Sequence, residues 1–295
     1  MPLKRLLSRA VPQFSKNAYH LLSAVAANLY FGFPGKKLIV IGVTGTNGKT
    51  TTAQMIGAIL RQGGKKAALA STVDYWIGHE RTINSSKYTT PSAWQLQKFL
   101  REALEAGCEY AVIETSSHAL DQERVWGIPY AVAVITNVTR EHLDYHRTME
   151  EYRRAKRKLF QRSRQAVINS DMEDPQYFAE AIKKPGRTVF YSTKTKEAEI
   201  YGAHIRPNFR QTEFRIGEEE YLLRMPGIFN IENALAAIAT AKLLGIDEQS
   251  VKEALKNLAG VPGRMEFFES AEGVDVIIDY AVTPDAFEKL YQAVL

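Results

Sequence analysis

The sequence predicts an α/β fold: a doubly wound, mostly parallel sheet that carries a phosphate-binding loop (P-loop). Three observations predict it. Residues 38–43 form a continuous apolar run, which is typical of a strand buried on both faces of a sheet. Further apolar runs alternate with helical patterns as far as residue 191. A glycine-rich turn at residues 45–48 joins the first apolar run to the first helical pattern.

Most of the expected sheet comes from the first two thirds of the chain. Short apolar runs predict strands at 38–43, 67–72, 110–114, 131–136, 166–169 and 187–191. Helices are predicted at 51–61, 91–107 and 148–160. Pro91 is expected in the first turn of its helix, because a proline is tolerated there. Thr148 and Glu151 predict a capping box that opens the third helix, which is rich in basic residues.

The rest of the chain has a different pattern. Residues 199–224 alternate polar and apolar side chains around two turns, which predicts a small antiparallel subdomain. Two helices follow, then a hinge at Val261-Pro-Gly, a strand at 274–279 and a helix that begins at Pro284. This last strand and helix begin an α/β domain that they do not complete. We therefore expect a helical segment (1–36), a central α/β domain (37–260) and the start of a C-terminal domain (261–295).

Composition indicates an ordinary globular protein. The 295 residues are 45% hydrophobic and 24% charged, which excludes disordered and fibrous classes. The net charge of +5 is spread along the chain without an aromatic platform, so no nucleic acid is expected as a partner. A single cysteine, Cys108, cannot form an internal disulfide and favours the cytoplasm. We expect a monomer.

The amino terminus resembles a leader only superficially. Basic residues precede an apolar stretch at 18–33, but His20, Ser23 and Asn28 interrupt it and no small-residue cleavage site follows. The stretch is also too short for a membrane span. An amphipathic helix packed on the domain is the preferred interpretation, and a membrane-surface anchor remains the alternative. The basic residues in question are Lys4, Arg5 and Arg9.

The glycine-rich turn predicts phosphate binding. It reads Gly45-Thr-Asn-Gly-Lys-Thr50 and lies between a buried strand and a helix, where backbone N–H groups and the helix N-terminus favour an anion. Lys49 would neutralise phosphate charge, and the Thr50 hydroxyl is placed to ligate Mg²⁺. Val43 stands where the usual pattern has its first glycine. The alternative is a glycine-rich turn with an exposed lysine.

Polar residues at other strand ends extend this site. Glu114 ends the third strand and suits Mg²⁺, while His142 follows the fourth and is equally suited to hydrogen bonding. Zinc is disfavoured, because neither a cysteine nor a helical His-x-x-x-His pair supports it. Lys156 lies in a basic run that, from the residues alone, reads as a solvated helix face.

Taken together, several segments resemble the Mur ligases, ATP-dependent amino acid ligases of peptidoglycan synthesis and cell-wall formation. They are Val43-Thr-Gly-Thr-Asn-Gly-Lys-Thr-Thr-Thr52, Glu114-Thr-Ser-Ser-His118, Thr136-Asn-Val-Thr-Arg-Glu-His-Leu-Asp-Tyr-His146 and Tyr152-Arg-Arg-Ala-Lys156. Tyr88-Thr-Thr-Pro91 and Ser116-Ser-His-Ala-Leu-Asp-Gln-Glu-Arg-Val125 are most similar to members that add the third residue (MurE type). Matching order and spacing continue through Gly227-Ile-Phe-Asn-Ile-Glu-Asn233, Gly263-Arg-Met-Glu266 and Asp279-Tyr-Ala-Val-Thr-Pro-Asp285.

The resemblance implies a role for each matching residue. ATP phosphates would be held by the loop, namely Gly45, Thr46, Asn47, Gly48, Lys49, Thr50 and Thr51. Asn233 or Asn230 would contact adenine, and Arg264 and Asp279 the phosphate or ribose. Magnesium would be held by Thr50, Glu114, His142 and, as a carbamate, Lys156. The catalytic set would be Lys49, Glu114, His142 and Lys156, and contacts to the UDP-MurNAc-peptide would come from Thr89, Thr90, Ser116, Gln122 and Arg124.

The resemblance also implies a reaction. A substrate carboxylate attacks the γ-phosphoryl group of ATP, and the amine of an amino acid then attacks the resulting acyl phosphate. Three differences from the family pattern bear on this: only about 36 residues precede the first strand, the C-terminal domain is incomplete, and Val282 stands where the family has histidine. Two other interpretations therefore stay open. One is a Mur-like ligase with another acceptor, similar to folylpolyglutamate or cyanophycin synthetases, and the other is a non-catalytic ATP-binding module.

Overall fold

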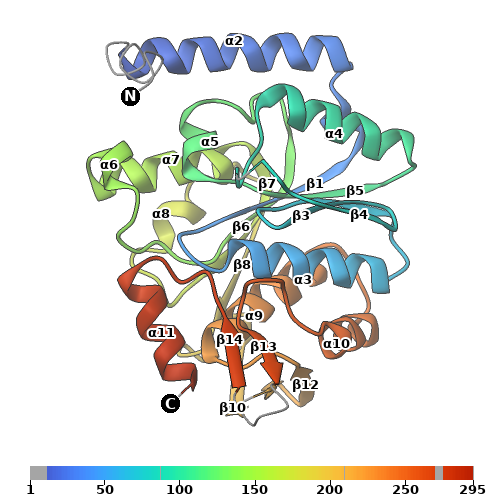
Figure 1. The fold of residues 1–295 in the computed structure, drawn as a ribbon, viewed down its shortest axis with the longest axis vertical. Helices are drawn as coiled ribbons and strands as arrows, with labels where there is room; N and C mark the ends of the chain where they lie inside the picture. Colours follow the sequence, from blue (N-terminus) through green and yellow to red (C-terminus); the bar gives the residue numbers. More distant parts are fainter. Residues whose placement is uncertain (1–11, 87, 209, 270–274, 295) are drawn as a thin grey trace.

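A nine-stranded sheet forms the centre of the computed structural model, which describes residues 12–86, 88–208, 210–269 and 275–294. Seven neighbouring strands are parallel; β3 pairs antiparallel with β2, and the edge strand β4 pairs antiparallel with β3. The predicted doubly wound, mostly parallel sheet is confirmed (Figure 1). The strand order is β4 (Glu80–Ile83), β3 (Asp74–Ile77), β2 (Ala67–Ala70), β5 (Tyr110–Glu114), β1 (Ile39–Thr44), β6 (Tyr130–Ile135), β7 (Ser163–Asn169), β8 (Arg187–Ser192) and β9 (Ile200–Tyr201).

Helices cover both faces of this sheet (Figure 1). One face carries α3 (Lys49–Gln62), α9 (Ile228–Leu243) and α10 (Glu248–Asn257). The other face carries α4 (Ala93–Glu105), α7 (Met149–Gln161) and α8 (Gln176–Ala179). Successive strand residues alternate between the two cores: Val40 packs on the second face, and Ile41 and Val43 pack on the first. This double burial explains why the strands are uninterrupted apolar runs.

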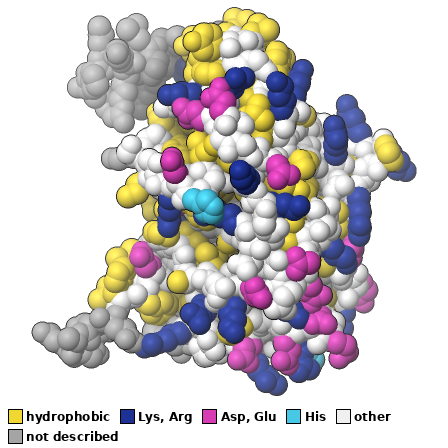
Figure 2. Space-filling view, turned by 90° about the vertical axis from the view of Figure 1, so that its right-hand side faces the viewer, with side chains coloured by type: hydrophobic (Ala, Val, Ile, Leu, Met, Phe, Trp, Pro, Cys, Tyr) yellow, Lys and Arg dark blue, Asp and Glu magenta, His cyan; other side chains and the backbone are white. Residues whose placement is uncertain are grey.

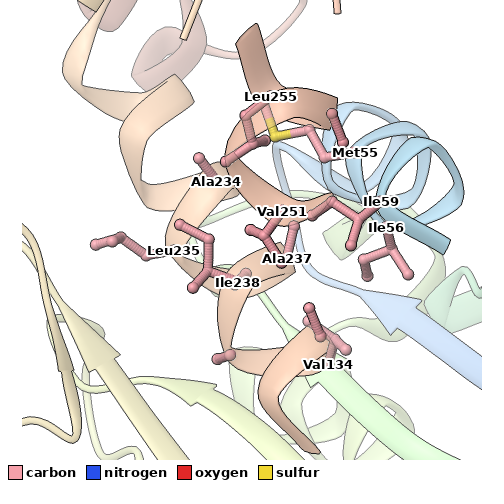
Figure 3. Packing of buried hydrophobic residues seen from close by; sticks show 14 of the residues in the cluster. Met55, Ile56, Ile59, Val134, Ala234, Leu235, Ala237, Ile238, Val251 and Leu255 are labelled. Atoms are coloured by element: carbon pink, nitrogen blue, oxygen red, sulfur yellow. The ribbon is translucent and has the colours of Figure 1, made fainter. Parts of the chain in front are cut away.

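The core beneath α3 fixes the position of the C-terminal end of the P-loop. Met55, Ile56 and Ile59 of α3 pack against Val251 and neighbouring apolar residues of α9 and α10 (Figure 3). All are buried, and burying a side chain of this size contributes about 1.5–3 kcal/mol to stability. The helix is therefore held firmly, and so is the loop that runs into its first turn.

The antiparallel subdomain is confirmed. Its three strands form one sheet in the order β10 (Ala203–Pro207), β11 (Thr212–Ile216) and β12 (Glu219–Leu223). Phe214 and Tyr221 lie opposite each other on β11 and β12 with ring centroids 5.3 Å apart. Both rings belong to the core of the first face, so the subdomain is joined to the sheet by apolar packing.

Two local predictions differ from the structure. The hairpin of β3 and β4 was not predicted, because β4 has no buried residue and β3 begins at the buried polar Asp74. Pro91 does not begin a helix: α4 begins at Ala93, and the Ser92 hydroxyl accepts a hydrogen bond from the Gln95 backbone N–H. The Gln95 side chain completes a capping box. At α7, the Thr148 hydroxyl accepts from the Glu151 N–H, but the Glu151 carboxylate lies against Arg154 instead of returning to Thr148, so only half of the predicted capping box forms.

The two ends of the described chain lie far apart in Figure 1. The helix α2 (Gln13–Phe31) packs on α4, as the preferred interpretation predicted, whereas Lys4, Arg5 and Arg9 lie outside the described residues. No helix in the described part combines the length and apolar character needed to cross a membrane. The remaining elements are the 3-10 turn η1 (Pro34–Lys37), α5 (Ser117–Asp121), α6 (Leu143–His146), β13 (Glu266–Glu269), β14 (Asp275–Ile278) and α11 (Pro284–Val294).

Candidate nucleotide-binding site

The loop between β1 and α3 requires glycine at two positions. Gly45 has φ +151° and Gly48 has φ +82°, values that side-chain-bearing residues rarely adopt. A Cβ at Gly45 would lie 1.9 Å from Thr136 Oγ1, and one at Gly48 would lie 2.2 Å from Asn233 Oδ1. The loop backbone is thus closely enclosed by neighbouring segments.

The end of β6 holds the loop in place. The backbone N–H of Thr46 donates to Asn137 O, and that of Asn47 donates to Asn137 Oδ1, both at 2.9 Å. The Thr136 hydroxyl donates to Asn47 O at 2.6 Å. These bonds fix the loop before any ligand binds, so little ordering would accompany phosphate binding.

Lys49 occupies the first turn of α3 and points back over the loop. Its Nζ donates to Thr46 O at 2.7 Å. Burial lowers the pKa of Lys49. The charges of Glu114 and Glu141 oppose this shift, and the charge of Arg264 adds to it. A cation and free helix N–H groups in one buried turn form an anion-binding arrangement.

Glu114 presents oxygen atoms beside the loop. The Thr50 hydroxyl lies 3.1 Å from both of its carboxylate oxygens. Thr72 donates to Oε2 from its backbone N–H at 2.8 Å and from its hydroxyl at 2.9 Å. A buried carboxylate and a hydroxyl at the end of an anion-binding loop are the hard oxygen donors that Mg²⁺ requires, so these residues fit that ion.

Lys156 is buried behind the loop, with 1% of its surface exposed. It lies on α7, and its Nζ donates to Gly45 O at 2.7 Å and sits 4.3 Å from the centre of the Tyr152 ring. Burial holds its pKa well below the ordinary value, and nearby Lys49 lowers it further against the opposing effect of Glu141. The solvated-face interpretation is therefore wrong for Lys156, and a lysine with such a pKa favours the uncharged amine that can react with CO₂.

His142 belongs to a cluster of aromatic rings next to the loop. It has φ +56°, and its Nε2 lies 3.5 Å from Glu141 Oε2. Its ring centre is 4.8 Å from that of His118, which in turn lies 5.4 Å from that of His146. Burial lowers the pKa of all three, to about 4 for His118 and His146, so the cluster is uncharged at neutral pH.

A cavity of about 330 Å³ lies over the loop and is closed on its far side by the C-terminal residues. Asn233 receives a hydrogen bond from the Thr52 hydroxyl at 3.2 Å and donates to Asn230 Oδ1 at 3.3 Å. Arg264 reaches Thr50 Oγ1 at 3.3 Å. Asp279 accepts from the Met265 backbone N–H at 2.8 Å, and burial raises its pKa. The predicted site residues in the cavity lining are Thr46, Asn47, Gly48, Lys49, Thr50, Thr51, Thr89, Glu114, His142, Asn230, Asn233, Arg264 and Asp279, and Val282 also lies there.

Other predicted contacts lie next to the cavity. The Thr90 hydroxyl donates to Glu114 O at 2.8 Å and accepts from the Ser116 N–H at 2.9 Å. Arg124 donates to Thr90 O at 2.7 Å, and Gln122 donates to the Tyr145 hydroxyl at 3.3 Å. Thr90, Ser116, Gln122 and Arg124 are absent from the cavity lining, as are Gly45 and Lys156 behind the loop.

Some residues of the site were not predicted. Thr72 and Asn137 each follow a parallel strand, and the rule that ligands meet the carboxyl ends of such strands could have selected both. Glu141 also lines the cavity, and its buried Oε2 accepts no hydrogen bond from any described residue. Lys289 of α11 lines the cavity too, and no motif marks it.

Curated relatives match this chain over more than nine tenths of its length. The UDP-N-acetylmuramyl-tripeptide synthetase of Roseiflexus sp. is 39% identical over 297 residues, which covers 94% of this chain and 58% of that protein. The UDP-N-acetylmuramoyl-L-alanyl-D-glutamate–2,6-diaminopimelate ligase of Clostridium perfringens is 37% identical over 278 residues, with 92% and 57% covered. The chain thus spans somewhat more than half the length of the curated relatives it matches.

Solved structures share the fold. A UDP-N-acetylmuramoyl-L-alanyl-D-glutamate–2,6-diaminopimelate ligase superposes with a TM-score of 0.73 at 31% identity, over 87% of this chain and 53% of that one. MurF from Acinetobacter baumannii superposes at 0.74 and 21% identity, over 92% and 57%, which shows the fold alone. The family model for the Mur ligase middle domain matches residues 43–241, from the end of β1 to α9. This chain belongs to the Mur ligase family.

Proposed function

We propose that this chain binds ATP with Mg²⁺ and forms the nucleotide-binding part of a ligase that joins an amino acid to a UDP-MurNAc-peptide. The observation that carries the proposal is the partly buried loop with Lys49 beside the buried Glu114 carboxylate, in one cavity with Asn233 and Arg264. The names of the relatives supply the acceptor, a UDP-N-acetylmuramoyl dipeptide, and 2,6-diaminopimelate as the candidate amino acid.

Cationic and anionic residues of the cavity would bind different parts of the Mg²⁺–ATP complex. Lys49 and the N–H groups of the first turn of α3 would bind the β- and γ-phosphates. Thr50 and Glu114 would hold one Mg²⁺, and His142 with a carbamate on Lys156 would hold a second. Bound magnesium supplies charge neutralisation on the phosphates. Asn230 or Asn233 would contact adenine, and Arg264 and Asp279 the ribose or phosphate.

The proposed reaction needs no protein nucleophile. A carboxylate oxygen of the acceptor forms a bond to the γ-phosphorus while the bond to ADP breaks, which yields an acyl phosphate. The amine of the incoming amino acid then attacks the acyl carbon, phosphate leaves and the amine loses a proton. The chain contributes positioning and charge: Lys49 binds the transferred group, and Thr89, Thr90, Ser116, Gln122 and Arg124 would orient the acceptor.

Two features bear on this proposal and its alternatives. The Thr90 hydroxyl donates to Glu114 O and Arg124 donates to Thr90 O, so these predicted acceptor contacts adjoin Glu114 although they do not line the cavity, and this favours the ligase. Val282 favours the non-catalytic alternative, because an apolar side chain lines the cavity where the resemblance implies histidine. The domain boundaries, the cytoplasmic location and the monomeric state stay predictions.

Titration calorimetry with ATP and Mg²⁺ tests nucleotide binding. We expect Lys49→Ala to weaken ATP binding about 10- to 100-fold, since a buried charge-assisted contact to phosphate is lost. Lys98→Ala is the matched control, because Lys98 is exposed on α4. Unchanged affinity in Lys49→Ala would refute the site.

Phosphate release tests turnover. The chain is mixed with ATP, a UDP-MurNAc-dipeptide and, in parallel, diaminopimelate, lysine or glutamate. Release that depends on both acceptor and amino acid supports the ligase. ATP binding without release under any combination supports the non-catalytic alternative.

A further inference from the structure

The helix α2 has an outward face made of large apolar side chains. Figure 2 shows hydrophobic side chains gathered at the end of the molecule where α2 lies. Leu22 and Tyr30 are 70% and 75% exposed, and the other large members of the face are exposed to a similar degree. The large apolar residues of this outer face are Phe14, Tyr19, Leu22, Leu29 and Tyr30.

Helical spacing places these residues together. Phe14, Leu22 and Leu29 are separated by eight and seven residues, or about two turns each, so they lie along one side of the helix. The opposite side is already used: Ala24 and Ala27 are fully buried, and Asn28 donates to Ala24 O and Trp126 O. Packing on the domain therefore explains the inner face and leaves most of the outer face exposed, Leu22 and Leu29 included.

The segment that carries this face is basic. Acidic groups also lie beside it: Asp121 accepts a hydrogen bond from Asn17 of α2, and Glu102 and Glu105 of the neighbouring helix α4 are paired with Lys98 and Arg101. The chain has no aspartate or glutamate before Asp74. Among the described residues, Lys16 lies on α2, and Lys36 and Lys37 are in the turn that follows it. The sequence before α2 adds Lys4, Arg5 and Arg9. A charged surface that docked here would have to be anionic.

Aromatic rings lie at the C-terminal end of the helix. The rings of Tyr30 and Phe31 lie 5.5 and 5.9 Å from that of Trp94, which is 41% exposed. Tyr and Trp are enriched at the level of lipid headgroups, because they combine an apolar ring with a polar group.

We infer that the outer face of α2 binds the surface of an anionic lipid bilayer, with the helix lying in the plane of the membrane. Apolar side chains would enter the headgroup boundary and the lysines would contact lipid phosphates. No residue of α2 lines the nucleotide cavity, so docking leaves that cavity accessible. The inference is independent of the proposed ligase activity.

Vesicle flotation of the full chain tests this inference. We expect flotation with vesicles of phosphatidylcholine and phosphatidylglycerol, weaker flotation with phosphatidylcholine alone, and release by high salt. The double variant Leu22→Asp/Leu29→Asp should reduce binding at least about tenfold, because two apolar contacts become charged. Ile83→Asp is the matched control, since Ile83 is 82% exposed on β4. ATP binding by each variant verifies folding.

Three outcomes would overturn the inference. The first is no flotation with either kind of vesicle. The second is equal flotation of the double variant, or equal flotation with neutral and anionic vesicles. The third is a dimer in light scattering that the double variant abolishes, because the outer face would then bind a second copy of this chain.

Discussion

The nucleotide cavity has two walls that are built differently. The sheet wall consists of the loop residues 46–51 with Glu114, and its key side chains are buried: Thr50 is 3% exposed and Glu114 is 1% exposed. The C-terminal wall consists of cavity-lining residues from Arg264 to Leu290, and it is open to solvent at Tyr280 and Val282. One wall belongs to the core of the sheet, and the other is attached to it by a few polar contacts.

The two walls therefore have different roles: the sheet wall sets the positions of the ligand-binding atoms, and the C-terminal wall closes the cavity. Backbone bonds from the end of β6 fix the sheet wall, so its N–H groups and oxygen donors are aligned without ligand. The C-terminal wall touches the loop through Arg264 with Thr50 and through Asp285 with Asn47. Isolated polar contacts at a partly exposed edge contribute little to stability. The sheet wall should therefore respond to substitution by losing structure, and the C-terminal wall by losing affinity.

The largest effect is expected for Gly48→Ala in the sheet wall. The new Cβ would approach Asn233 Oδ1, and Asn233 cannot move freely because the Thr52 hydroxyl bonds to the same oxygen. Positive φ adds about 1–2 kcal/mol and overpacking about 1–3 kcal/mol of destabilisation. Chemical denaturation should show the loss, and ATP binding should be abolished.

Gly64→Ala separates the two causes. Gly64 has φ +71°, but a Cβ added there would meet no atom within 4 Å, so only the backbone cost of about 1–2 kcal/mol applies. This variant should keep its ATP affinity. If both variants lost the same stability, a Cβ at position 48 would add no steric cost. The loop would then not be tightly enclosed by its neighbours, contrary to our description of the sheet wall.

The next effect concerns Lys156, which lies behind the sheet wall. We expect a carbamate on its Nζ, because burial lowers the pKa of Lys156 and thereby favours the uncharged amine, the form that reacts with CO₂. In ¹³C-bicarbonate, NMR should show one carbamate signal that Lys156→Met removes and Lys98→Met keeps. Phosphate release should fall about 100-fold in Lys156→Met, the typical effect of losing one preorganised charge.

Two results would contradict this prediction. One is a spectrum without a carbamate signal in the unsubstituted chain under bicarbonate. The other is a Lys156→Met variant that turns over normally. Folding of this variant is expected, because a methionine of similar length replaces a buried amine with an apolar group.

The sheet wall could be predicted from the sequence far better than the C-terminal wall. Buried parallel strands are continuous apolar runs, so their ends and the polar residues that follow them, such as Glu114, are visible in the sequence. Asp74 and the β4 strand carry no such signal, because a buried polar residue and an exposed edge strand both break the pattern. The burial of Lys156 was also invisible, since the basic run around it covers a helix whose other basic residues are more exposed.

The C-terminal wall depends on contacts between distant segments. Arg264 and Thr50 are 214 residues apart, and no local pattern indicates their approach. The same holds for Lys289, which enters the cavity only because α11 lies across from the loop. The apolar stretch that forms α2 was visible in the sequence, but it was interpreted as an amphipathic helix, and the sequence alone could not show which of its apolar residues the domain leaves exposed.

The smallest structural effect is expected for Arg264→Ala in the C-terminal wall. The guanidinium donates to Thr50 Oγ1 at 3.3 Å and lies 4.8 Å from the centre of the Tyr280 ring, both at the partly exposed edge of the cavity. Its loss should change the free energy of unfolding by less than about 1 kcal/mol. ATP affinity should fall about tenfold, because the proposed contact of this cation with the phosphate or ribose of ATP is lost. Calorimetry and denaturation of the same sample measure both quantities, with Arg101→Ala on α4 as the control. A stability loss as large as that of Gly48→Ala would show that the C-terminal wall is part of the folded core, and the contrast between the two walls would then fail.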